Sequence, residues 1–101
     1  MTGVQTCALP IWAFPLYIDA RYNLGFLFNQ QGRFEAAAEV LRTAVYFDPD
    51  DPGSRFELAR AYEGMKDFER AKMELRQALS RGTALSPAEK KLVARKLSTL
   101  P

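Results

Sequence analysis

The sequence repeats itself with a spacing of 34 residues. The tetrad Tyr-Asn-Leu-Gly at positions 22–25 returns as Phe-Glu-Leu-Ala at positions 56–59. Further pairs at the same offset agree in identity or size: Phe28 with Tyr62, Phe34 with Phe68, Ala37 with Ala71, Leu41 with Leu75, and Ala44 with Ala78. A fixed period of about 20–50 residues is typical of solenoids, in which each unit buries its apolar face against its neighbours. The period therefore predicts an array of like units.

Within each unit, apolar residues recur at helical spacing. The pattern predicts helices at residues 18–31 and 34–47, and again at 52–65 and 68–80. Gly32 is the expected stop of the first helix. Because only two or three residues separate the members of each pair, the two helices must pack antiparallel as a hairpin.

Small residues mark the places where the paired helices are expected to cross closely. These are Gly25 with Ala37 in the first hairpin, and Ala59 with Ala71 in the second. Large side chains around them are expected to fill the remaining space. We therefore predict that Leu24 and Gly25 together hold the first hairpin.

The segment between the hairpins, residues 48–53, is rich in Asp and Pro. Asp51 before Pro52 predicts a helix N-cap followed by proline at the first helical position. The three aspartates do not have the spacing of a calcium-binding loop. We predict caps and a turn here, and no metal site.

A third unit is expected to begin at Ser86. Ser86 and Glu89 have the spacing of a capping box around Pro87. Leu92 then falls at the repeat position of Leu24 and Leu58, so the register is expected to continue. Residues 86–101 would be a terminal capping helix or the first helix of a further repeat.

The N-terminal stretch does not follow the helical pattern. Residues 1–11 resemble a translated DNA-sequencing adaptor, which predicts a non-native leader on a truncated gene. A signal peptide is the alternative, but no basic residue precedes the apolar run, and Pro10 and Pro15 interrupt it. Pro15 lies 34 residues before Pro49, so residues 12–17 are expected to end a truncated preceding repeat.

Composition argues against several classes of function. The net charge of +2 makes no strong case for binding nucleic acid. Histidine, the commonest general base and metal ligand, is missing, and a single cysteine cannot form an internal disulfide. No apolar run reaches the length of a membrane span. We expect no enzymatic activity, no metal and no cofactor.

The repeated residues resemble those of the tetratricopeptide repeat (TPR) family. The residues that carry the resemblance are Leu24, Gly25, Phe28, Ala37, Leu41, Ala44 and Pro49 in the first copy, and Leu58, Ala59, Tyr62, Ala71, Leu75 and Ala78 in the second. Arg21 and Arg55 stand where the family often has Trp, and Thr83 replaces the second closing Pro. The resemblance implies an all-α, alpha-alpha superhelix with two full repeats at residues 18–51 and 52–85.

The resemblance also implies a concave groove lined by the first helix of each repeat. The residues expected to face a partner there are Tyr22, Asn23, Phe26, Asn29, Gln30, Phe56, Arg60 and Glu63. Aromatic anchors beside amides and an arginine suit a peptide or a partner helix. Tyr22 and Phe56 could instead pack against the neighbouring repeat. They also occupy the places of the lysines that a chaperone-tail clamp requires, so that specialisation is not expected.

The expected function is a protein–protein interaction scaffold. The alternative is a non-catalytic repeat segment of a larger bacterial enzyme, or of an outer-membrane or secretion assembly protein. A protein or peptide partner is expected in either case, and nucleic acid is not.

Overall fold

The structure, a computed structural model, describes residues 14–81 and 85–101. Every element in these two ranges is a helix: α2 (Phe14–Gln30), α3 (Phe34–Phe47), α4 (Pro52–Gly64), α5 (Phe68–Arg81) and α6 (Pro87–Thr99). None of the described helices is both long and apolar enough to cross a membrane. The adaptor-like residues 1–11 and Thr83 lie outside the described residues.

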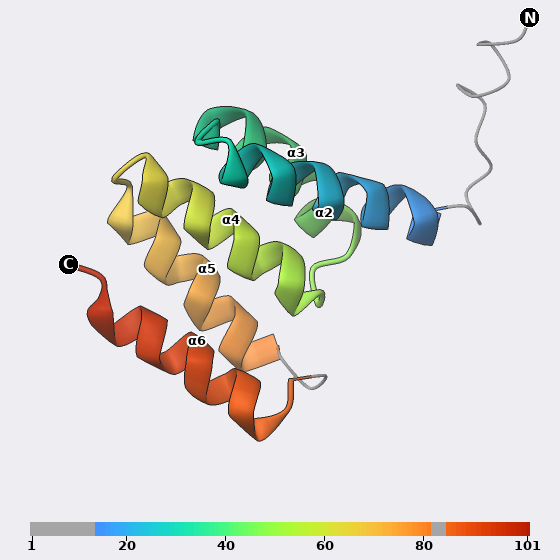
Figure 1. Ribbon diagram of the computed structural model, residues 1–101. Helices are drawn as coiled ribbons and strands as arrows, with labels where there is room; N and C mark the ends of the chain where they lie inside the picture. The colour runs from blue at the N-terminus through green and yellow to red at the C-terminus, as the bar shows by residue number, and fades with distance from the viewer. Residues whose placement is uncertain (1–13, 82–84) are drawn as a thin grey trace, which may run out of the picture.

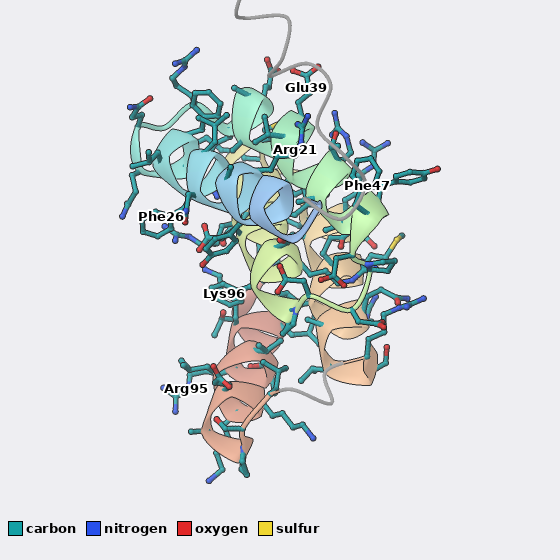
Figure 2. The ribbon with its side chains drawn as sticks, turned by 90° about the vertical axis from the view of Figure 1, so that its right-hand side faces the viewer. Arg21, Phe26, Glu39, Phe47, Arg95 and Lys96 are labelled. Carbon is teal, nitrogen blue, oxygen red and sulfur yellow. The ribbon has the colours of Figure 1, made fainter. Side chains whose placement is uncertain are left out.

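The helices form two hairpins followed by a single helix (Figure 1). α2 packs on α3 and α4 packs on α5, while α3 lies against α4 and α5 against α6. In Figure 2, α2 and α6 lie toward one side of the molecule, and α3 and α5 lie toward the other. The predicted all-α helical repeat is confirmed.

Local signals in the sequence set the helix ends. Gly32 has a φ of 76°, a left-handed conformation that glycine adopts freely at a helix C-terminus. The Asp51 carboxylate accepts a hydrogen bond from the Gly53 N–H at 3.2 Å at the start of α4. Ser86 and Glu89 form the predicted capping box of α6.

α2 begins earlier than the sequence predicts. Residues 14–17 belong to this helix, whereas the sequence predicts its start at residue 18. Pro15 is tolerated in the first turn because the N–H groups there have no intrahelical acceptor in any case. Pro49 differs, because it lies in the turn between α3 and α4. The division into repeats at residues 18, 52 and 86 stays a prediction.

Small residues permit the close helix crossings, as expected. Ala37 and Ala71 are fully buried, and so are Leu41 and Leu75 beside them. A Cβ atom at Gly25 would lie only 2.6 and 2.8 Å from the two Cδ atoms of Leu41. The first hairpin therefore depends on the missing side chain at position 25.

The prediction that Leu24 helps to hold this hairpin is wrong. Leu24 is 41% exposed, whereas Leu58 at the equivalent position of α4 is 1% exposed. α3 packs against α4 from the preceding hairpin, and no described helix covers the corresponding side of α2. Burial at this repeat position thus depends on the preceding unit and not on the helix's own hairpin.

The predicted register of the third unit also needs correction. Leu92 is 59% exposed, and the next residue, Val93, is buried in its place. Leu97 and Leu100 pack beside Val93 on the core. α6 therefore exists as predicted but turns a different side toward α5.

Candidate partner-binding surface

Side chains from α2, α4 and α6 line one open depression of about 210 Å³. Its lining is Tyr22 from α2, Pro52, Gly53 and Phe56 from α4, and Leu85, Glu89, Leu92 and Val93 from the segment leading into α6 and from α6 itself. Glu89 is the one charged residue of this lining. The depression is therefore an apolar hollow with a carboxylate at its edge.

The helix starts bring these side chains together. The Asp51 cap places Pro52 and Gly53 in the first turn of α4. The Tyr22 ring lies over this turn, and a Cβ atom at Gly53 would be 3.4 Å from the ring, an ordinary van der Waals contact. On α6, residues three and four apart share a face, which brings Glu89, Leu92 and Val93 to the same hollow.

Tyr22 lies in a negative environment. Its pKa is raised above the ordinary value of 10.0, first by burial and then by the carboxylates of Glu57 and Asp51, while Arg60 opposes the shift. Burial and nearby negative charge both disfavour the phenolate. The hydroxyl therefore stays protonated at neutral pH and can donate a hydrogen bond.

A buried polar contact joins α2 to α4. The Asn29 side-chain amide donates to the backbone oxygen and to Oε1 of Glu57, each at 3.0 Å. Both residues are buried. Arg60 lies 3.3 Å from the Glu57 carboxylate and balances its charge. This contact fixes the position of α2 on α4 and with it the position of Tyr22.

A salt bridge joins α4 to α6 on the same side of the molecule. The Lys96 ammonium lies 2.7 Å from Oε1 of Glu63. Figure 2 shows Lys96 on the side from which Phe26 also projects, whereas Phe47 projects from the opposite side. The sequence did not predict this pairing of Lys96 with Glu63.

The structure places the eight predicted groove residues in three groups. Tyr22 and Phe56 are partly buried and meet in the depression. Asn29, Arg60 and Glu63 are engaged in the polar contacts described above. The remaining three lie along α2, where Asn23 and Gln30 are exposed and Phe26 is partly exposed. Their contact with a partner stays a prediction.

The sequence did not identify Glu89, Leu92 and Val93 of α6 as residues of this surface. Leu92 was assigned to the core by repeat register, and Glu89 was recognised for its capping role alone. The face of α6 that meets α5 depends on packing, which the repeat pattern does not encode. The spacing of Leu85, Glu89 and Leu92 is the signal that could have pointed to a shared face.

Arg55, at a position where the family often has Trp, is buried and has a defined structural role. Its Nε donates to the backbone oxygen of Pro49 at 2.8 Å, and its guanidinium forms a 2.8 Å salt bridge with Glu74 on α5. The arginine therefore ties the turn before α4 to the second helix of the hairpin. The sequence marked the position but did not predict the partners.

Consecutive antiparallel hairpins with a shared surface on their first helices define a helical-repeat protein. A family model described as tetratricopeptide repeat matches residues 28–95. The match covers more than half of the chain, so the chain belongs to the tetratricopeptide repeat family, whose repeats generally serve as protein-interaction modules. The search of curated proteins found no match, and neither did the search of solved structures.

Proposed function

We propose that this chain is a protein–protein interaction scaffold that binds a partner peptide or helix on the surface formed by α2, α4 and α6. The observation that carries the proposal is the depression in which Tyr22 and Phe56 meet. Partly exposed aromatic side chains in a hollow are typical anchors of protein interfaces.

The rest of α2 supports the same use. Asn23 and Gln30 are exposed and Phe26 is partly exposed along this helix. Amide side chains can donate to and accept from a peptide backbone, while an aromatic ring supplies apolar contact area. Such a mixture suits recognition of an extended chain or an amphipathic helix.

A second candidate is a repeat segment within a larger bacterial enzyme or an outer-membrane or secretion assembly protein. Leu24 and Leu27 are exposed on α2, and exposed apolar side chains on one helix favour packing against a further protein unit. In that case the chemistry would lie outside this sequence, and the surface would serve the assembly of the larger protein.

Selection of short linear peptides from a random displayed library, with the 101-residue chain as target, tests the proposal. We expect the selected peptides to lose binding to Tyr22→Ser and to keep binding to Tyr46→Ser. Tyr46 is a matched control because it is highly exposed on α3 and does not line the depression.

Two results would count against the proposed surface. One is a library that yields no enriched peptide. The other is a set of peptides that responds to Tyr46→Ser but not to Tyr22→Ser. Binding to single-stranded RNA that survives physiological salt would contradict the expectation of a protein partner.

A further inference from the structure

The depression between α2, α4 and α6 has the size of one large side chain. Its volume is about 210 Å³, and an apolar cavity of about 150 Å³ is large enough to bind benzene. One leucine or one aromatic ring fits this space. A partner would therefore place a single anchor here.

The walls of the depression suit an apolar anchor. Tyr22 and Phe56 present ring surface from two helices, and Leu92 contributes a mostly exposed side chain from a third. An anchor between them would remove apolar area of all three from water, which is the main driving force of such contacts.

The charges around the depression favour a particular charge on the partner residue next to the anchor. Glu89 lines it, and Asp51 and Glu57 lie close enough to Tyr22 to raise the pKa of its hydroxyl. Arg60 is paired with Glu57 and Lys96 with Glu63, and Lys90 and Lys91, which follow Glu89 on α6, do not line the depression. The Glu89 carboxylate in the lining therefore favours a positive group on the partner.

We infer that this depression takes one leucine- or aromatic-sized side chain of a partner peptide in which a lysine or arginine stands next to that anchor. The inference rests on the proposed function and adds the chemistry of the partner. The basic residue faces Glu89, and the anchor lies between Tyr22, Phe56 and Leu92.

The inference of an apolar anchor is tested with peptides selected on the wild-type chain from the random displayed library. They should share a large apolar residue beside Lys or Arg. Leu92→Gln should weaken their binding by about tenfold or more, as loss of a contact to an interface anchor does. Met73→Gln is the matched control, because Met73 is similarly exposed but lies on α5, and it should leave affinity unchanged.

The inference of a basic partner residue facing Glu89 is tested with Glu89→Gln. A glutamine at this position can still form the capping box, so α6 keeps its start while the charge is removed. Binding should weaken several-fold, and its dependence on salt should decrease. Glu69→Gln, in the first turn of α5, is the matched control and should have no effect.

The outcomes separate this inference from the proposed function. Peptides that respond to Tyr22→Ser but not to Leu92→Gln or Glu89→Gln would overturn the inference and leave the proposed function standing. A library without enriched peptides would count against both. A chain that dimerises in solution through Leu92 would also overturn the inference, because the occupant would then be a second copy.

Discussion

At residue 25, glycine lets the backbone of α2 approach the fully buried Leu41. The equivalent residue of the second hairpin is Ala59, which is buried with its methyl group in place. The two crossings therefore differ in the space that they leave. The crossing of α2 and α3 is the tighter one, and it has no space for a side chain at position 25.

Gly25→Ala should lower the free energy of unfolding by about 1–3 kcal/mol, because the new methyl group overpacks the crossing. This is expected even though alanine is favoured over glycine in helices by about 1 kcal/mol. Urea unfolding of the variant and the wild type measures the difference. In a Leu41→Ala background the same change should be neutral or stabilising. A Gly25→Ala variant more stable than the wild type would contradict the close approach.

Tyr22 supplies a prediction about pH. Its pKa is raised in the folded protein above 10.0, so its contribution to stability is complete below that pH and is lost as the pH rises through the folded-state pKa. Between pH ~9 and ~11, the wild type should therefore lose more stability than Tyr22→Phe. Chemical unfolding at both pH values measures this. Equal losses in the two proteins would show that the Tyr22 hydroxyl is not in a negative, buried environment.

At the scale of the helices, the ion pair of Arg55 with Glu74 fixes the geometry of the second hairpin, whereas the ion pair of Arg81 with Asp50 does not. The Arg55 and Glu74 side chains are 9% and 16% exposed, whereas those of Arg81 and Asp50 are 46% and 71% exposed. A buried charge that loses its partner destabilises the folded protein, because water cannot reach the charge to solvate it. At the surface, water solvates the remaining charge, so the loss of the partner costs little.

Glu74→Gln should therefore destabilise the protein by about 3 kcal/mol, since it leaves the Arg55 guanidinium without a counter-charge. Asp50→Asn should cost less than about 1 kcal/mol. Thermal unfolding of the two variants, each of which replaces a carboxylate by its amide, gives the comparison. Equal effects would mean that the Arg55 contact does not organise the corner at Pro49.

The boundaries of the helices were largely predictable, because they depend on neighbouring residues. The Asp51 cap, the capping box at Ser86 and the stop at Gly32 each involve groups within a few positions of one another. The start of α2 was not predicted, because proline is common both in the turn that follows a helix and in the first turn of a helix. The structure distinguishes these two positions, because α2 continues from Phe14 through Pro15.

At the scale of the whole molecule, burial is greatest in the middle of the array. Leu58 and Tyr62 of α4 and Leu75 of α5 are buried, whereas Leu24 and Leu92 of the outer helices are exposed. In a linear array each unit is stabilised by its neighbours. A helix that has a described neighbour on just one side is therefore stabilised less.

Hydrogen–deuterium exchange should therefore be slowest in the centres of α4 and α5 and faster in α2 and α6, because local opening is easiest where fewer apolar contacts are lost. Mass spectrometry of peptic peptides covering each helix measures this order. Uniform protection along the chain would show that the two hairpins and α6 unfold as a single unit.

The candidate site was predictable in part. Tyr22 and Phe56 were expected on the partner-facing side, and the structure brings them to one hollow, although their contact with a partner remains a proposal. The role of Asn29 as a buried link to Glu57 was not predicted. Whether a polar side chain faces solvent or a neighbouring helix depends on the exact rotation of that helix.

The sequence by itself determined the period, the hairpins and most helix ends, because these follow from local patterns and from similarity at a spacing of 34 residues. Tertiary structure alone decided which copy of a repeated residue is buried. Leu24, Leu58 and Leu92 are the same residue at the same repeat position, yet only Leu58 is covered. The physical reason is that burial depends on the contacts between helices: no described helix covers that side of α2, and α6 turns Val93 instead of Leu92 toward α5.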